Sequence, residues 1–212
     1  MGRIKRKTNP AFAIVADGET EIWYLQMMKQ NERQVRLTIK PELPKKKRIE
    51  DQCELVCKLA QGEYDKVFWI VDLDQITKEQ REATGGKKDP MRTFIECREK
   101  VLLGKKYAKR IRVIVNNPCL EFWFLLHYTH TAKSFKDYEE LEKALKKHME
   151  DYNKSEGYFK QKNNDIYSKL KPRLKKAIEH SDRLGSFDPQ APSKAVSEMP
   201  QFFRTEELNG LF

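Results

Sequence analysis

The sequence predicts an α/β protein with a largely parallel sheet flanked by helices and a C-terminal helical lobe. Short apolar runs typical of buried strands alternate with amphipathic segments through residues 11–128, which is the order of a layered α/β architecture. From Ser134 onward, apolar residues recur only at helical spacing. We therefore expect an α/β core at residues 10–130 and a helical lobe at residues 131–212.

The first three elements are a buried strand, an amphipathic helix and a half-exposed strand, expected at residues 11–16, 20–30 and 34–39. The first strand is apolar and stops at Asp17 and Gly18, which form a turn signal. Thr20 is a typical helix-capping residue. The second strand alternates apolar and polar side chains, and we expect Pro41 to break it.

The rest of the core repeats this order, with a helix, a strand, a helix, a strand and a helix expected at residues 49–61, 66–72, 91–103, 110–115 and 119–128. The strand that ends at Asp72 is the most apolar, as a central parallel strand buried on both faces must be. In the lobe, Ile166, Leu170 and Leu174 recur at helical spacing, and we expect Pro172 to start a new helix or to kink that one.

The composition excludes several classes of protein. The 212-residue chain has a formal net charge of +10, and 39% of its residues are apolar, so it is too polar for a membrane protein and too apolar for a disordered one. No apolar stretch is long enough to span a bilayer and no signal-peptide pattern is visible, so we expect a cytoplasmic protein without membrane association.

The positive charge favours nucleic acid as a partner. A solvated basic surface is the alternative.

The four cysteines are expected to be reduced thiols that pack as small apolar side chains. Cys53 and Cys57, together with His127 and His130, can supply zinc ligands, but their separation lacks the regularity of a zinc finger. We therefore favour buried thiols over a zinc site.

Acidic side chains follow two of the expected strands at their carboxyl ends, where ligands bind in an open parallel sheet. Asp17 follows the first strand, and Asp72 and Asp74 close the central strand, where extended backbone would place both side chains on one face. Glu21, at the start of the first helix, can turn back toward them. Converging carboxylates repel one another unless a hard divalent cation neutralises them, which predicts a Mg²⁺ or Mn²⁺ site. The alternative is that each is an ordinary turn or helix-end acid.

Four further residues are candidates for substrate binding. Asn117 and Glu121 follow the next strand, at the start of a helix, where they can orient a substrate phosphate or a metal-bound water. The alternative is that such residues satisfy backbone groups and the helix dipole. Lys87 and Lys88 lie in a glycine-containing loop that follows the central strand, so they are the basic residues best placed to hold a phosphate.

Three motifs in the sequence resemble those of known proteins. A strand that ends in an acid and Gly, in Val-Ala-Asp-Gly-Glu-Thr-Glu (residues 15–21), and a strand that ends in Asp-x-Asp, in Trp-Ile-Val-Asp-Leu-Asp (69–74), resemble the Toprim pattern of topoisomerases, primases and OLD-family nucleases. The third motif, Asn-Asn-Pro-Cys-Leu-Glu-Phe-Trp-Phe-Leu-Leu-His (116–127), is similar to a hallmark of the RloB-like family of bacterial defence proteins within that class.

This resemblance implies a Toprim-like core that cleaves phosphodiester bonds of RNA, including tRNA, or of DNA with one or two metal ions, as the effector of an anti-phage abortive-infection system. It implies Asp72 and Asp74 as metal ligands, Asp17 in the place of the Toprim glutamate, and Glu21 as an accessory ligand or base, so that these four residues are both catalytic and metal-binding. Asp17 is one methylene shorter than the usual glutamate, which makes it less suited to proton transfer.

The resemblance also implies a separately encoded ATPase partner, because this sequence contains no Gly-x-x-x-x-Gly-Lys-Ser loop of its own. The alternative function is a non-catalytic subunit of a defence complex that binds nucleic acid or protein. Self-association into a homo-oligomer is compatible with either function.

Overall fold

The computed structural model describes residues 9–16, 18–35, 38–42, 48–82, 89–104, 107–208 and 212. Within these residues a five-stranded sheet has the order β2-β1-β3-β4-β5, formed by β1 (Ala11–Val15), β2 (Thr38–Glu42), β3 (Lys66–Asp72), β4 (Ile111–Asn117) and β5 (Val196–Ser197). The first four strands are parallel and β5 pairs antiparallel with β4. The predicted α/β class with a largely parallel sheet is therefore confirmed, and the arrangement is consistent with a Toprim-like fold.

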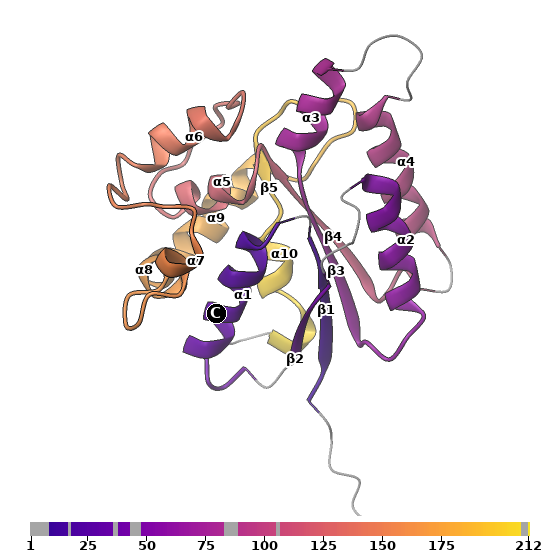
Figure 1. Cartoon of the computed structure of the whole chain (residues 1–212), viewed down its shortest axis with the longest axis horizontal. Coiled ribbons are helices and arrows are strands. Elements are labelled where there is room, and N and C mark those ends of the chain that lie inside the picture. Colours follow the sequence, from indigo (N-terminus) through magenta and orange to yellow (C-terminus); the bar gives the residue numbers. More distant parts are fainter. Residues whose placement is uncertain are drawn as a thin grey trace, which may run out of the picture.

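Helices cover both faces of the sheet. Figure 1 shows α2 and α4 on one side, and α1, α5 and α10 on the other, with α3 beyond the carboxyl end of the strands. The helices are α1 (Thr20–Asn31), α2 (Ile49–Ala60), α3 (Leu73–Glu82), α4 (Pro90–Leu103), α5 (Leu120–Leu126), α6 (Tyr138–Leu145), α7 (Glu156–Phe159), α8 (Ile166–Leu170), α9 (Leu174–Leu184) and α10 (Pro200–Phe203).

The side chains of β3 alternate between two hydrophobic cores. Phe68 and Ile70 pack with residues of α1, α5 and α10, whereas Val67 and Trp69 pack with residues of α2 and α4. All four side chains are at most 1% exposed. The indole Nε1 of Trp69 donates a hydrogen bond to Gln52 Oε1 at 2.8 Å, which satisfies the polar atom that this large side chain buries. Burial on both faces explains why the sequence of β3 is continuously apolar.

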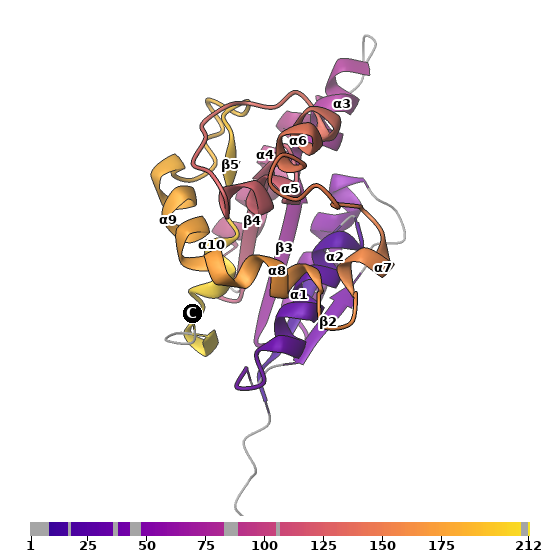
Figure 2. The same ribbon diagram turned by 90° about the vertical axis from the view of Figure 1, so that its left-hand side faces the viewer.

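The C-terminal residues that we assigned to a lobe also complete the sheet. β5 adds a strand beside β4, and Phe202 of α10 lies 4.9 Å from Phe68 and 6.3 Å from Phe12 between ring centroids. Figure 2 shows α9 and α10 beside β4, and α8 close to α1. One hydrophobic cluster therefore includes residues from both predicted regions.

Three local predictions were wrong. β2 continues through Pro41, which is tolerated because β2 is an edge strand of the described sheet. Thr20 is the first residue of α1 and makes no capping bond, because its hydroxyl donates to Glu21 Oε2 at 3.2 Å. A helix, α3, starts at Leu73 directly after β3, so the backbone after Asp72 is helical and not extended.

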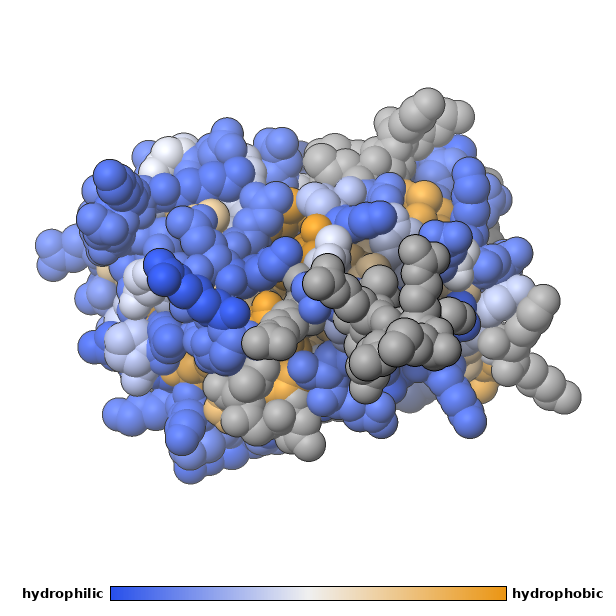
Figure 3. All heavy atoms as spheres, turned by 90° about the horizontal axis from the view of Figure 1, so that it is seen from below, coloured by the Kyte–Doolittle hydropathy of each residue, from blue (hydrophilic) through white to orange (hydrophobic). Residues whose placement is uncertain are grey.

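The surface is largely polar on the face shown in Figure 3, where hydrophobic residues are visible as small separate patches. Among the described residues, the large apolar side chain that is exposed is Leu103. None of the described helices combines the length and the apolar character needed to cross a membrane.

Candidate functional site

An open cleft of about 400 Å³ lies at the carboxyl end of β3. It is formed by the start of α1, the end of β3, the start of α3 and the loop between α6 and α7. The described residues that line it are Gly18, Glu19, Thr20, Glu21, Trp23, Asp72, Asp74, Gln75 and Lys154. The structure therefore brings together three of the four acids singled out in the sequence, Glu21, Asp72 and Asp74, whereas Asp17 lies outside the described residues.

Asp72 is held by one group at the end of the neighbouring strand β4 and one at the start of α5. Its Oδ1 accepts a hydrogen bond from Asn116 Nδ2 at 3.2 Å, and its Oδ2 accepts the backbone N–H of Leu120 at 3.1 Å. Asn116 is fully buried, and its Oδ1 accepts a hydrogen bond from the Ser197 hydroxyl at 2.7 Å. Asp72 and Asn116 are register partners in the sheet, so this contact follows directly from strand pairing.

Asp74 reaches the cleft from the first turn of α3. Its backbone N–H donates to the carbonyl oxygen of Pro118 at 2.9 Å, and its Oδ1 accepts the N–H of Gln75 at 2.7 Å. Asp72 and Asp74 thus line one cleft from a strand end and a helix start. We predicted their proximity for the wrong reason, because it does not come from an extended Asp-x-Asp segment.

Glu21 lines the cleft from the first turn of α1 and is only 2% exposed. A Cβ atom placed on Gly18 would lie 3.1 Å from Glu21 Oε2. Such a contact is closer than ordinary van der Waals packing, so any side chain at position 18 would press on the carboxylate. Glycine at this position therefore leaves room for Glu21 to face the cleft.

Glu121 is the most buried acid of this region, with no exposed surface. Its Oε1 accepts hydrogen bonds from the Tyr152 hydroxyl at 2.8 Å and from Lys154 Nζ at 3.0 Å. Its Oε2 is buried and has no hydrogen-bond partner among the described residues. Burial on its own would lower the pKa of Lys154, but the nearby charge of Glu121 raises that pKa above its ordinary value, so Lys154 stays cationic.

Asp72, Cys119 and Glu121 form a cluster of three potential metal ligands. One donor atom of each lies within 4.8 Å of the donors of the other two. Cys119 is 1% exposed and its thiol is free. Burial raises the pKa of this thiol, and the charges of Glu121, Asp72 and Asp74 raise it further. Carboxylate and thiolate groups in such a cluster can hold a divalent cation.

The remaining predicted residues have other positions. The Asn117 side chain donates to the carbonyl oxygens of Pro192 at 3.0 Å and Lys194 at 2.9 Å, so it fastens the segment before β5. It is not among the described residues that line the cleft, and its role in substrate binding stays a prediction. Lys87 and Lys88 lie outside the described residues.

Sequence reasoning missed Lys154 and Tyr152. Both belong to the segment between α6 and α7 and reach Glu121, more than thirty residues earlier in the chain, only through the packing of the C-terminal region. Isolated lysines and tyrosines in a basic, aromatic-rich segment carry no signal that would have singled them out. Trp23 lines the cleft and also packs edge-on against Phe159, at the border of the hydrophobic core.

A second cleft of about 460 Å³ adjoins the first and shares Asp74 and Gln75 with it. Its lining mixes basic and acidic side chains, and the described residues that complete it are Lys78, Arg81, Glu82, Lys136, Asp137, Tyr138 and Glu139. The two clefts together form a continuous surface at the carboxyl edge of the sheet.

The fold and the site define an α/β protein with an acidic cleft at the carboxyl edge of a mainly parallel sheet. A family model described as RloB-like protein matches residues 12–204, which is most of the chain. The chain therefore belongs to the RloB-like family, as the three sequence motifs indicated. Searches of curated proteins and of solved structures found no significant match.

Proposed function

We propose that this protein is a metal-dependent nuclease that cleaves RNA or DNA as the effector of an anti-phage abortive-infection system. The observation that carries the proposal is that Glu21, Asp72 and Asp74 line one cleft at the carboxyl edge of the sheet. Membership of the RloB-like family suggests a defence-related protein and supports the biological context.

The donor set of the cleft fits a divalent cation. Glu21, Asp72 and Asp74 offer carboxylate oxygens, which are the ligands that Mg²⁺ and Mn²⁺ prefer. The buried Glu121 Oε2 without a described partner adds negative charge that a cation would stabilise. In this proposal Glu21, Asp72 and Asp74 hold the ion together with Asp17. The ion would neutralise charge that develops on the scissile phosphate.

The side chains of the chain itself would bind and orient the substrate. Lys154 lines the cleft with its side chain 39% exposed, so its ammonium can donate to a phosphate oxygen while Glu121 holds it in place. Lys78, Arg81 and Lys136 in the adjoining cleft can contact neighbouring phosphates. Glu21 lines the same cleft as Lys154 and can accept a proton from an attacking water.

The test is cleavage of labelled RNA and DNA by the purified protein with Mg²⁺ or Mn²⁺, alone and with the separately encoded ATPase partner that we infer. We expect wild type to cleave one of the substrates and Asp74→Asn to lose most of this activity, since the amide cannot balance a cation. Asp188→Asn is the matched control, because Asp188 is an exposed acid outside the cleft, and it should retain activity.

Binding of nucleic acid without cleavage under all these conditions would instead support a non-catalytic subunit. Asp17, shorter than the glutamate of the Toprim pattern, is the residue that favours this second candidate function.

A further inference from the structure

We propose that Cys119 and Glu121, together with Asp72, form a buried metal subsite whose thiolate selects Mn²⁺, Co²⁺ or Zn²⁺ over Mg²⁺. The inference rests on the proposed function for the presence of an ion near Asp72, which belongs to both groups of ligands. It goes further by assigning two new ligands and a metal preference. Its decisive readout is spectroscopic and does not require nuclease activity.

The first argument is distance. Metal–sulfur bonds of about 2.3 Å and metal–oxygen bonds of about 2.0–2.2 Å place two ligands on opposite sides of one ion at most about 4.5 Å apart. The three donors of Asp72, Cys119 and Glu121 lie within 4.8 Å of one another. Small rotations of side chains would therefore bring all three onto one ion.

The second argument is the unsatisfied oxygen of Glu121. The side chain has no exposed surface, and its Oε2 has no hydrogen-bond partner among the described residues. A buried charged oxygen without a partner is costly. A cation bound between Glu121 and Asp72 would remove this cost. The competing explanation is that the Cys119 thiol donates a hydrogen bond to Glu121, a contact that also raises the pKa of the thiol, and that leaves no place for a metal ion.

The third argument is the chemistry of sulfur. Mg²⁺ is a hard ion that requires oxygen ligands, whereas Zn²⁺, Co²⁺ and, to a lesser degree, Mn²⁺ accept thiolate sulfur. Glu21, Asp72 and Asp74 alone would suit Mg²⁺. Cys119 at 1% exposure adds a ligand that favours the other ions, with the metal taking the place of the thiol proton.

Titration with Co²⁺ tests the proposal, because cobalt bound to a thiolate has an intense near-ultraviolet charge-transfer absorption. Wild type should develop this band as one ion binds, and Cys119→Ser should bind without it. Glu121→Gln should weaken Co²⁺ binding at least about tenfold. Cys53→Ser is the matched control, since Cys53 is equally buried but packs in the core on the α2 and α4 side, and it should keep the band.

A variant in which Cys53, Cys57 and Cys97 are all serine keeps Cys119 as its only thiol and should also show the band. This variant keeps the test decisive even if Cys119→Ser fails to fold. Absence of the band in folded wild type, or its persistence in Cys119→Ser, would overturn the proposal. If the protein cleaves nucleic acid but shows no cobalt–thiolate band, the nuclease proposal stands and the metal subsite is wrong. If it shows the band but does not cleave, the metal subsite stands and the nuclease proposal is wrong.

Discussion

The side chain of Asn116 links two distant parts of the chain at the site. Its amide nitrogen donates to Asp72, and its amide oxygen accepts the hydroxyl of Ser197 in β5. In the metal site that we propose, a carboxylate oriented by a buried amide would have little freedom to turn away from the ion, and such supporting contacts strongly affect metal affinity. The precision of the site therefore depends on a residue outside the cleft lining.

We expect Asn116→Ala to lower Mn²⁺ affinity about 10–100-fold, because Asp72 loses the bond that orients it. The free energy of unfolding should also fall by about 1–3 kcal/mol, since Ser197 loses its buried partner. Calorimetric titration and urea unfolding measure the two effects. Asn117→Ala is the control, because it breaks bonds to Pro192 and Lys194 only. An equal loss of affinity in both variants would show that Asn116 does not orient Asp72.

His127 is a buried residue whose protonation opposes folding. It is 1% exposed, its Nδ1 lies 2.9 Å from the carbonyl oxygen of Trp123, and its Nε2 has no partner among the described residues. Burial lowers its pKa from 6.5 to about 3. Between these values the unfolded chain binds a proton that the folded chain does not, so stability is complete above pH 6.5 and decreases as the pH falls toward 3.

We expect wild type to lose about 2 kcal/mol more stability between pH 7 and pH 5 than His127→Phe, since each pH unit below the unfolded pKa contributes about 1.4 kcal/mol. Urea unfolding of both proteins at the two pH values gives the difference and cancels contributions from other groups. If both proteins lose the same stability, His127 accepts a proton in the folded state and the prediction is wrong.

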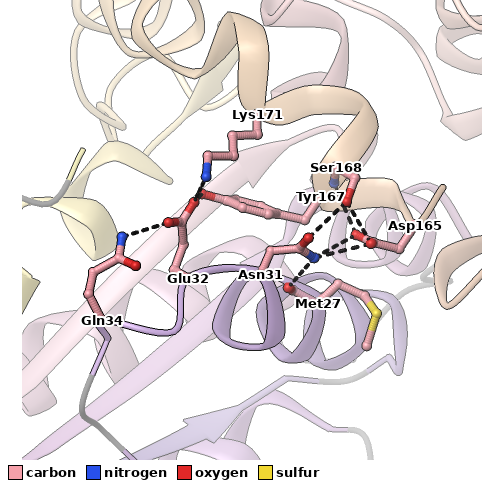
Figure 4. Close-up of polar contacts among 8 residues, drawn as sticks. All are labelled: Met27, Asn31, Glu32, Gln34, Asp165, Tyr167, Ser168 and Lys171. Atoms are coloured by element: carbon pink, nitrogen blue, oxygen red, sulfur yellow. Dashed lines mark hydrogen bonds and ion pairs between the residues drawn. The ribbon is translucent and has the colours of Figure 1, made fainter. Parts of the chain in front are cut away.

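At the scale of elements, α1 and α8 are joined by a polar cluster (Figure 4). Asp165 caps α8 by accepting the N–H of Ser168 at 3.0 Å, and both of its oxygens accept from Asn31 Nδ2 at 3.1 and 3.2 Å. Next to it, Glu32 accepts from the Tyr167 hydroxyl at 2.8 Å. These contacts fix the end of α1, the helix whose first turn carries Glu21.

We expect Asp165→Ala to destabilise the protein by about 1.5–3 kcal/mol, because it removes a helix cap worth about 1 kcal/mol together with the hydrogen bonds from Asn31 and the Ser168 hydroxyl. Asp137→Ala is the matched control, since Asp137 caps α6 through the N–H of Glu140 and is less buried, so it should cost about 1 kcal/mol. Urea unfolding measures both. A similar cost for the two variants would mean that the contact with α1 adds no stability.

The elements that could be predicted are those whose burial leaves a pattern in the sequence. β1 and the interior of β3 are buried on both faces and are therefore continuously apolar, and β4 is apolar from Val113 to Val115. α3 was missed because it is short of apolar residues and starts without a turn, and β5 because two residues carry no periodicity. The presence of Asp72 and Glu21 in one cleft could be predicted, because the carboxyl ends of parallel strands lie at the same edge of a sheet. The contacts of Lys154 and the cluster around Cys119 depend on packing between distant segments, so local patterns could not predict them.

On the scale of the whole molecule, a net charge of +10 coexists with an acidic cleft. Lys154 lines this cleft, and the adjoining cleft adds Lys78, Arg81 and Lys136, which are mixed with acids. Overall positive charge attracts a polyanion, and the local arrangement decides where it is held. In the function that we propose, a cation bound by the acids of the cleft would reduce their repulsion of a substrate phosphate.

We expect the double variant Lys78→Gln and Arg81→Gln to weaken binding of labelled RNA or DNA and to reduce the slope of log affinity against log salt by about 2, because two phosphate contacts are lost. Fluorescence anisotropy across a salt series measures both quantities. The control is Lys176→Gln with Arg183→Gln, which removes the same charge from exposed positions of α9 and should leave the slope nearly unchanged. If both pairs have equal effects, binding responds to net charge alone.

The partners that hold the acids of the site come late in the chain. Asp72 is oriented by Asn116, which depends on Ser197, and Glu121 is held by Tyr152 and Lys154. A ribosome that has made the first 130 residues has produced every described acid of the site but none of the groups that secure Glu121, and the hydroxyl that supports Asn116 is added only at Ser197. The site is thus completed only after Ser197 has been added, so a chain that stops before this residue does not carry it in assembled form.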